Sequence, residues 1–535
     1  SQNGNIRTPA VMTDNQIIQP TVPRSESVRA RLAALAWEEG LSAFVTNAVP
    51  FSFSSGRVLA GGIAHLVDAL AKDEESIRVM ELGAGIGYLS AFCLDSIADR
   101  FPETYRKTQF LVTDAEATLV RDAESRGVLG RHASHARFDV SDLRDHDSIL
   151  SHQPRLLILS YLLDAIPPDH VEDRDDGLYP IHVETSIPDD ASVFDGSVWP
   201  PRILDAQAIS ELLTNRFDDL TPELGRRIAP FLEESWSWVA EDRPAEQSVM
   251  FNSRQDPVQR LCAILSAMPD ESAVVITDFG YVSPEKIAPS EMMTEYGLCA
   301  FWAVFFDEIQ DFAFTSGFET FLLAAEEGET HTLVLYKGEK PDRMDAAFRS
   351  GFEGMVSDRP RYVLYNLEED AGLDDIHKAI DKIEETMPEE EVNSYGNLSR
   401  FVHLLLQFED VERAVEYAKR CVDLYPEVSA PEMAILGSSA GRAGDLPAAE
   451  VYFRKAIEVA AGHADAYLGL SGVYKARQDW ERYFSCIKEY LRTADCDVAE
   501  VMSGIAETLK GTKLEVVAKQ ASDWLLEYEA GYVDG

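Results

Sequence analysis

The first two thirds of the chain alternate short apolar runs with longer segments of helical periodicity. The apolar runs have the length of buried strands and cover residues 79–82, 109–114, 136–143, 156–163 and 272–278. Between them, segments such as 88–97 place apolar residues at helical spacing. Strands that alternate with helices predict a parallel sheet of the Rossmann-like α/β class. Two further runs, at 312–315 and 330–336, are expected to add an antiparallel pair and complete seven strands.

The predicted sheet is interrupted between its fourth and fifth strands. Residues 170–268 are too many for a loop, so we expect an inserted cap within an α/β domain that spans 76–340. Alternation at 178–185 predicts a hairpin arm, whereas 206–217 and 222–239 have helical patterns. An insertion at this edge overhangs the sheet, which favours a substrate cap. Its candidate pocket walls are Trp199, Trp236 and Trp238, although any one of them is more often a core residue than a ligand contact.

The segments before the sheet have two different characters. Residues 1–24 are polar and rich in Asn, Gln, Thr and Pro, a composition typical of a flexible tail. Residues 25–75 begin with a helical pattern and continue into a loop that is too apolar for idle surface. In that loop Pro50, Phe51 and Phe53 either form a lid over a ligand or fill gaps in the core.

The last third of the chain is predicted to be helical and repetitive. Residues 341–394 form a charged linker that is partly helical, and 395–535 have helical patterns throughout. Residues 430–463 and 464–497 are in register at a period of 34, as in an all-α tetratricopeptide-repeat solenoid, and a weaker copy precedes them. Such repeats bind a peptide or a partner subunit, or serve as a homodimerisation or stabilising module.

Candidate chemistry gathers where the predicted strands end. A glycine-rich turn, Glu81-Leu82-Gly83-Ala84-Gly85-Ile86-Gly87, follows the first strand and leads into the helix that begins at Tyr88. Later strands end in polar residues: Asp114, Asp139, Asp142, Ser160, Tyr161, Asp164 and Asp278. Because the carboxyl ends of parallel strands meet at one edge of a sheet, these residues predict a ligand crevice.

These motifs resemble those of the class I S-adenosylmethionine-dependent methyltransferases. Leu162-Leu163-Asp164-Ala165-Ile166-Pro167 and Thr277-Asp278-Phe279-Gly280 are similar to motifs of the MidA-like branch, although Ser160-Tyr161 replaces its Asn-Glu. The later His-Val-Asp-Phe of that branch is also not recognisable in Ala303-Val304-Phe305-Phe306. A dinucleotide dehydrogenase would use a similar turn, but the acid before Gly83 and the Asp142-Leu143 pair favour the methyl donor.

The resemblance implies S-adenosylmethionine as cofactor and assigns roles to individual residues. Cofactor-binding residues would be Glu81, Gly83, Ala84, Gly85, Gly87, Tyr88, Asp114, Asp139, Asp142, Leu143 and Ser160, and catalytic residues Asp164, Tyr161 and Asp278. Asp164 is also readable as a simple helix cap. The implied activity is N-methylation of a protein or peptide side chain, arginine among them, recruited through the repeats. Two alternatives stay open, a methyltransferase of small biosynthetic molecules and a non-catalytic assembly scaffold.

The composition of the chain limits the classes of partner and ligand that it is expected to bind. The chain has 93 acidic and 48 basic residues and a formal net charge of −45, which argues against nucleic acid and anionic membranes as partners. The charge would attract a cationic substrate, although it could also serve solubility alone. Six scattered cysteines suggest neither disulfides nor zinc, and His132 and His135 have no evident third ligand, so no metal is expected. No apolar run is long enough to span a bilayer, which favours a cytoplasmic protein.

Overall fold

The computed structural model describes residues 15–50, 54–239, 253–283, 292–352, 364 and 371–533. Its central sheet has the strand order β16-β17-β12-β5-β2-β3-β4, and the short β15 (Val304–Phe305) pairs with β12. The strands are β2 (Ile77–Leu82), β3 (Thr108–Asp114), β4 (Ala136–Val140), β5 (Leu156–Ser160), β12 (Ser272–Tyr281), β16 (Glu319–Leu323) and β17 (Glu329–Lys337). The first five are parallel and β17 is antiparallel to both neighbours. The predicted Rossmann-like fold class is confirmed.

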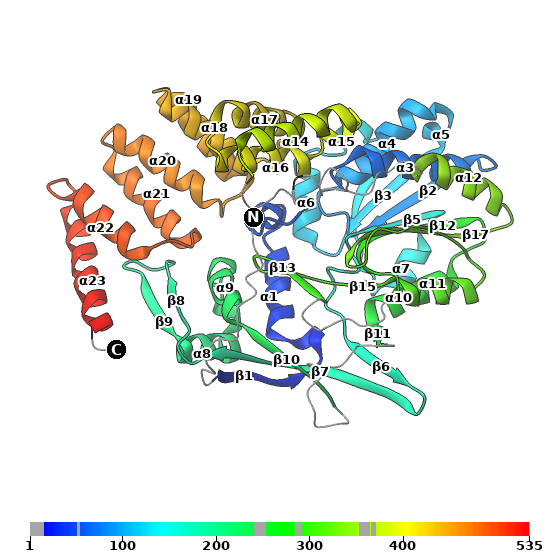
Figure 1. Cartoon of the computed structure of the whole chain (residues 1–535), viewed down its shortest axis with the longest axis horizontal. Helices are drawn as coiled ribbons and strands as arrows, with labels where there is room; N and C mark the ends of the chain where they lie inside the picture. The colour runs from blue at the N-terminus through cyan, green and yellow to red at the C-terminus, as the bar shows by residue number, and fades with distance from the viewer. Residues whose placement is uncertain are drawn as a thin grey trace.

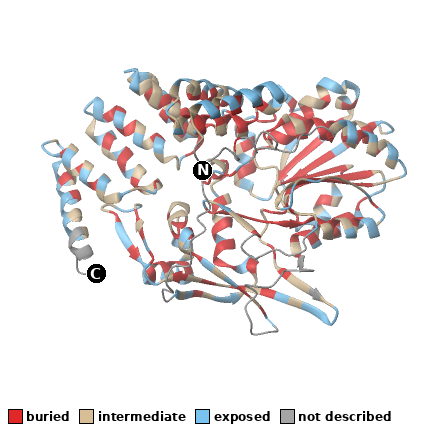
Figure 2. Cartoon of the chain, in the orientation of Figure 1, coloured by how far each residue is buried: buried red, intermediate tan, exposed pale blue. Residues whose placement is uncertain are grey.

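Helices cover both faces of the central sheet (Figure 1), whose strands β2, β5 and β12 are largely buried (Figure 2). Side chains of successive strand residues enter two different cores. Val79 packs on the side of α3 (Arg57–Ala71) and α4 (Tyr88–Arg100), and Met80 packs on the opposite side. The remaining helices of this layer arrangement are α5 (Pro102–Lys107), α6 (Ala117–Ser125), α7 (His146–Ser151), α10 (Asp256–Ala267) and α11 (Phe306–Thr315).

One strand of the predicted antiparallel pair was assigned to the wrong residues. Residues 312–315 end helix α11, and the strand beside β17 is β16. Phe306, Ile309 and Ala313 are buried at helical spacing against the sheet, so this apolar run forms a helix.

The inserted cap contributes most of a second layer of strands, drawn at the bottom of Figure 1, and β1 and the β13–β14 hairpin from outside the insertion complete this layer. Its sheet combines β1, β6, β7, β10 and β11, and β8 pairs with β9. Two helices and the β13–β14 hairpin lie beside it. The elements are β6 (His170–Arg174), β7 (Gly177–Pro188), β8 (Ser192–Asp195), β9 (Arg202–Asp205), α8 (Ala206–Asn215), α9 (Pro222–Ile228), β10 (Glu233–Trp238), β11 (Ser253–Gln255), β13 (Met293–Tyr296) and β14 (Cys299–Trp302).

Three expectations for the cap and the N-terminus need correction. Residues 15–22 form strand β1 (Asn15–Val22), which pairs with β7, so the predicted tail is wrong for this part. The helix predicted over 222–239 ends at Ile228, and β10 follows. Helix α10 packs on the central sheet, so the insertion ends before it. The N-terminal helices are α1 (Val28–Trp37) and α2 (Ser42–Thr46), and 3-10 turns occur at 24–26, 130–132, 217–219 and 229–231.

The predicted linker begins with a helix that belongs to the α/β domain. Helix α12 (Pro341–Phe352) packs on α3, and Phe352 is fully buried. A Cβ atom on Gly62 of α3 would lie 2.9 Å from the Phe352 ring, so glycine is required for this close approach. The linker expectation is therefore wrong for residues 341–352, while 353–363 and 365–370 lie outside the described residues.

The C-terminal region is all-helical, as predicted. After α14 (Leu373–Thr386) and α15 (Glu389–Val392), the chain forms helical hairpins whose first helices begin 34 or 35 residues apart. The hairpins are α16 (Tyr395–Gln407) with α17 (Val411–Leu424), α18 (Ala430–Arg442) with α19 (Leu446–Val459), α20 (Ala464–Ala476) with α21 (Trp480–Thr493), and α22 (Val498–Leu509) with α23 (Glu515–Val533). No helix among the described residues is long and apolar enough to cross a bilayer.

The helical region is joined to the α/β domain by a continuous hydrophobic core. Leu398 and Phe401 of α16 and Tyr425 after α17 are buried in the same core as Ile63 of α3 and Phe92 of α4. The predicted boundary at residue 395 therefore separates two sequence patterns that share one core.

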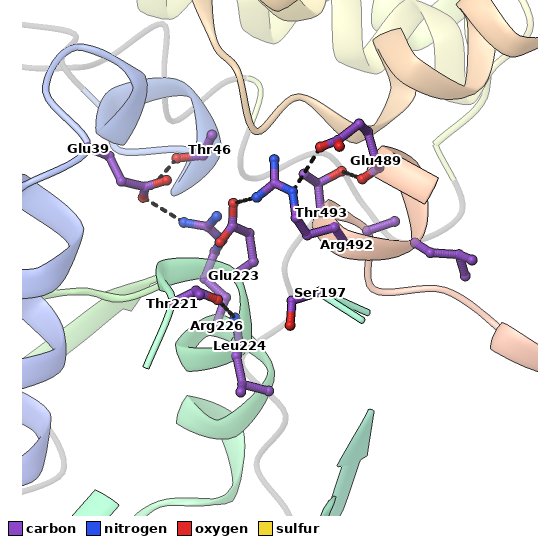
Figure 3. A network of polar contacts seen from close by, with 12 residues as sticks. Glu39, Thr46, Ser197, Thr221, Glu223, Leu224, Arg226, Glu489, Arg492 and Thr493 are labelled. Atoms are coloured by element: carbon purple, nitrogen blue, oxygen red, sulfur yellow. Dashed lines mark hydrogen bonds and ion pairs between the residues drawn. The ribbon is translucent and has the colours of Figure 1, made fainter. Parts of the chain in front are cut away.

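Polar contacts join the helical region to the cap, and the cap to the segment after α1. Arg492 of α21 forms an ion pair with Glu223 of α9, and Arg226 pairs with Glu39 at 2.6 Å (Figure 3). Arg227 donates to the carbonyl oxygens of Leu491 and Arg492 at 2.8 and 3.1 Å, which caps the carboxyl end of α21. In Figure 1 the helical region thus arches from the central sheet to the cap.

Candidate functional site

A cavity of about 940 Å³ lies at the carboxyl ends of the parallel strands of the central sheet. The glycine turn after β2 and the ends of β3, β5 and β12 form one part of its wall. Helix α1, the segment after α2 and the β13–β14 hairpin form the other part. The cavity therefore lies between the sheet and the layer that covers it, at the edge where the sequence predicted a crevice.

Glycines shape the turn that lines the cavity. Gly83 and Gly85 have φ values of +67° and +52°, and a Cβ atom on them would lie 2.7 Å from Leu162 and Phe44, respectively. Side chains are thus excluded here by backbone conformation and by space. Gly87 was also predicted to bind the cofactor, but it packs near Phe138 and does not line the cavity. Its φ of +83° instead permits the sharp entry into α4.

Asp114 connects this turn to the end of β3. Its Oδ2 accepts a hydrogen bond from the Gly85 amide at 2.9 Å, and its Oδ1 accepts one from the Glu116 amide at 3.0 Å. Burial raises the pKa of Asp114 above its usual value. Each carboxylate oxygen keeps acceptor capacity beyond one amide, so Asp114 can also receive the two hydroxyl groups of a ribose.

Glu81 is a buried acid in the cavity wall. Only 2% of its surface is exposed, and the Ser90 hydroxyl donates a hydrogen bond to its Oε2. Burial raises the pKa of Glu81 to about 7. A cationic ligand group next to Glu81 would stabilise the ionised form, so Glu81 fits the ammonium group of S-adenosylmethionine, directly or through a water.

The affinity for S-adenosylmethionine is expected to fall as the pH drops below about 7. Below the free-state pKa of about 7, binding must first remove a proton from Glu81, which costs up to about tenfold in affinity per pH unit. Calorimetric titrations between pH 5.5 and 8 measure this dependence. Glu81→Gln should bind more weakly at pH 8 and lose most of the pH dependence. An equally steep profile in Glu81→Gln would assign the dependence to another group.

The segment after β4 contributes Asp142 and Leu143 to the cavity. Burial opposes ionisation of Asp142, but hydrogen bonds from the Arg144 side chain and amide hold its pKa below the usual value. Asp142 is therefore a carboxylate that can accept a hydrogen bond from an adenine amine. Asp139 was predicted as a cofactor ligand, but it pairs with Arg137 at 3.1 Å and does not line the cavity.

Two aspartates form a buried pair at the cavity wall. Asp164 lines the cavity and is 2% exposed, whereas Asp278 is fully buried and lies outside the lining. Asp278 Oδ2 accepts hydrogen bonds from the amides of Leu163 at 2.9 Å and Asp164 at 3.4 Å. Burial raises the pKa of both carboxyls, and their interaction favours a single proton held by the pair.

The end of β5 supplies two further predicted residues. Ser160 is 7% exposed, lines the cavity, and its Oγ has no hydrogen-bond partner among the described residues. Tyr161 also lines the cavity, and its hydroxyl lies 3.3 Å from Thr330 Oγ1. The Tyr161 backbone has a φ of +52°, a conformation that is strained for a bulky residue. Asp164 Oδ1 is likewise buried without a partner in the described structure, so both polar atoms remain available to a ligand.

An aromatic wall completes the cavity, and the sequence analysis did not assign it. Trp37 lies against Phe44 and Phe301 with ring centroids 5.6 and 6.3 Å apart, and Tyr296 lies 5.8 Å from Phe301. All four line the cavity, as does Arg260 of α10. Two signals could have pointed to them, the helical pattern before the sheet and the apolar run at 296–306.

The predicted lid and cap tryptophans have mixed outcomes. Pro50 lines the cavity, while Phe51 and Phe53 lie outside the described residues. The three tryptophans do not line the cavity. Trp236 and Trp238 are buried in the strand layer of the cap, and Trp199 packs on Phe484 of the helical region.

The described residues contain no group of three or more histidine, cysteine, aspartate or glutamate side chains that could hold a metal ion. His132, which the sequence analysis considered, lies 2.9 Å from Asp95 and 2.8 Å from the Tyr105 hydroxyl.

Comparison with known protein families supports the cofactor. The model of a family described as "Putative S-adenosyl-L-methionine-dependent methyltransferase" matches residues 58–296. A Burkholderia thailandensis protein crystallised with S-adenosyl-homocysteine is similar, with 14% identity, 59% of this chain and 88% of that chain covered, and a TM-score of 0.35. The crystal structure of MamA is similar at 21% identity over 30% of this chain and 93% of that chain, with a TM-score of 0.27. No curated protein is significantly similar to the chain.

Proposed function

We propose that this S-adenosylmethionine-dependent methyltransferase methylates a nitrogen atom of a protein or peptide side chain, with arginine among the candidate residues. The observation that carries the proposal is the Asp164–Asp278 pair, because Asp164 lines the cavity beside the cofactor residues and keeps a buried oxygen without a partner in the described structure. We also propose that the chain is a member of the MidA-like branch and that its helical hairpins are repeats of the tetratricopeptide type. The motif at 162–167 and the hairpin period of 34 or 35 residues support them.

The cavity residues fit S-adenosylmethionine. Glu81 would hold its ammonium group, Asp114 its ribose hydroxyls, and Asp142 with Leu143 its adenine. Bound there, the cofactor supplies an activated methyl group on a sulfonium. The chain then has to place the acceptor in line, exclude water and accept the proton that the nitrogen loses.

The Asp164–Asp278 pair can accept the proton that the acceptor nitrogen loses. Asp164 Oδ1 can accept a hydrogen bond from the acceptor N–H and thereby orient the nitrogen lone pair. Behind it, Asp278 is held as an acceptor by two backbone amides. The pair therefore keeps negative charge next to a nitrogen that becomes cationic, and it can take up the released proton. Ser160 and Tyr161 would contact the same acceptor.

The charge and shape of the cavity favour a cationic side chain. Asp256 and Glu329 add carboxylates to the lining, and Arg260 forms an ion pair with Asp256 at 3.3 Å. The aromatic wall of Trp37, Phe44, Tyr296 and Phe301 offers ring faces to a cation and to an apolar stem. The net charge of −45 would attract such a substrate over longer distances.

Exposed apolar side chains on the helical region are consistent with recruitment of a protein substrate. Leu424 and Val451 are 50% and 53% exposed on helices α17 and α19. The alternative role of the repeats is dimerisation, which sedimentation of the purified chain would reveal.

Radiolabelled methyl transfer to cell extract tests the proposed substrate class. Wild-type protein with labelled S-adenosylmethionine is expected to label protein bands, and label confined to small solutes would refute a protein substrate.

Asp164→Ala is expected to lower the turnover at least about 100-fold while it keeps cofactor affinity, because Asp164 would act on the acceptor. Asp114→Ala is the matched contrast, since it should weaken cofactor binding. Unchanged turnover in Asp164→Ala would remove the acid pair from the mechanism.

A further inference from the structure

A short loop of the helical region contacts the cofactor end of the cavity. Tyr88 lines the cavity and is the first residue of helix α4, directly after the glycine turn. Its hydroxyl donates a hydrogen bond to Glu427 Oε2 at 2.5 Å, across 339 residues of sequence. Glu427 lies in the loop between α17 and α18, so the helical region bonds directly to a side chain of the cavity wall.

Tyr425 in the same loop fixes the ring of Tyr88 and the segment that follows the predicted lid. The Tyr88 and Tyr425 rings are 5.5 Å apart in an edge-to-face arrangement, and Phe92 stacks on Tyr88 at 5.8 Å and lies 6.4 Å from Tyr425. The Tyr425 hydroxyl lies 3.1 Å from the Ser55 carbonyl oxygen and 2.7 Å from that of Asn393. The neighbouring Ser54 lines the cavity.

These contacts are buried, so they constrain the cavity wall. Tyr88 and Tyr425 are 7% and 4% exposed. Burial, and then the adjacent Glu427 carboxylate, raise the pKa of Tyr88 well above its usual value, so the phenol stays a donor throughout the physiological range. Hydrogen bonds to a charged partner in such surroundings are among the stronger ones in proteins.

We infer that Tyr425 and Glu427 of the helical region are positioning residues of the cofactor site, which act through Tyr88 and the backbone at Ser55. The repeats then have a role besides recruitment, because they hold the start of α4 and the backbone at Ser55 in the geometry that receives the cofactor. The inference rests on cofactor binding at this site and is independent of the acceptor proposed above.

Calorimetric titration of the full-length chain with S-adenosylmethionine and S-adenosyl-homocysteine tests this role in single variants. Glu427→Leu and Tyr88→Phe are each expected to bind about tenfold more weakly, since both lose the same charged hydrogen bond. Glu427→Gln keeps an acceptor oxygen and is expected to stay within about threefold of the wild type. Glu416→Leu, at an exposed position of α17, is the control and should bind normally.

The double variant separates a shared route from general damage. If the hydrogen bond carries the effect, Tyr88→Phe combined with Glu427→Leu loses no more affinity than either change alone. A loss of affinity in the double variant equal to the product of the two single losses would overturn the inference. Wild-type affinity in a folded Tyr88→Phe variant would overturn it as well. So would equal losses in Glu427→Gln and Glu427→Leu. If Glu427→Leu does not fold, the single variants Tyr88→Phe and Glu427→Gln test the inference by the affinity changes expected for them above. Absence of binding by the wild type would instead refute the cofactor site itself.

Discussion

Replacing Gly85 with arginine is expected to abolish S-adenosylmethionine binding, with affinity reduced more than about 100-fold. Gly85 has a φ of +52°, and a Cβ atom there would lie 2.7 Å from the Phe44 ring. A side chain would therefore have to displace Phe44 or extend into the cavity that the turn lines. The backbone conformation costs a further 1–3 kcal/mol or so for a residue other than glycine. Isothermal titration calorimetry of the folded variant measures the loss.

Gly130→Arg provides the matched control for this substitution. Gly130 is exposed, does not line the cavity, and has open space within 4 Å of the position that a Cβ atom would take. This variant should bind S-adenosylmethionine like the wild type. Retained binding in Gly85→Arg, with circular dichroism showing native folding, would place the cofactor elsewhere.

Removal of residues 395–535 is expected to prevent stable folding of the remaining chain. Leu398, Phe401 and Tyr425 are buried in the same core as α3 and α4, next to the cofactor turn. Loss of a single large core side chain typically costs about 2–5 kcal/mol, and a domain has only about 5–15 kcal/mol in total. The truncated chain should aggregate or melt without a cooperative transition, as measured by circular dichroism and analytical gel filtration.

A shorter truncation distinguishes this loss of core from a general sensitivity to deletion. Ending the chain after Asp497 removes α22 and α23, whose described side chains contribute nothing to the core shared with the α/β domain. That protein should fold and keep its cofactor affinity, although it loses the Trp199–Gln520 hydrogen bond to the cap at 3.0 Å. A protein ending at residue 394 that melts cooperatively and binds the cofactor normally would show that the shared core is dispensable.

Most of the predicted cofactor residues could be located from the sequence alone. Glu81, Gly85, Asp114 and Asp142 occupy a local motif or a strand end, so their place followed from sequence. The carboxyl ends of parallel strands must meet at one edge, whatever surrounds the sheet. Asp139 shows the limit of this reasoning, because adjacent strand residues point to opposite sides and its side chain pairs with Arg137 instead.

Asp278 shows a second limit, which concerns environment. Its position after the fifth strand suggested an open crevice residue, yet it is fully buried beside Asp164, and burial raises the pKa of both carboxyls. Whether a strand-end carboxyl meets solvent or another acid depends on neighbouring strands and on the loop that covers them. The spacing of residues in the sequence carries no information on how close two such carboxyl groups lie in the fold.

By itself the sequence determined the Rossmann-like sheet, the glycine turn, the strand-end positions of Asp114 and Asp142 and the helical hairpins, because each follows from a local period or spacing. Tertiary structure alone decided the aromatic wall, the buried acid pair and the bond from Tyr88 to Glu427 across 339 residues. These contacts join elements whose separate patterns are compatible with many arrangements. Only the burial of a common core brings their side chains within reach of one another.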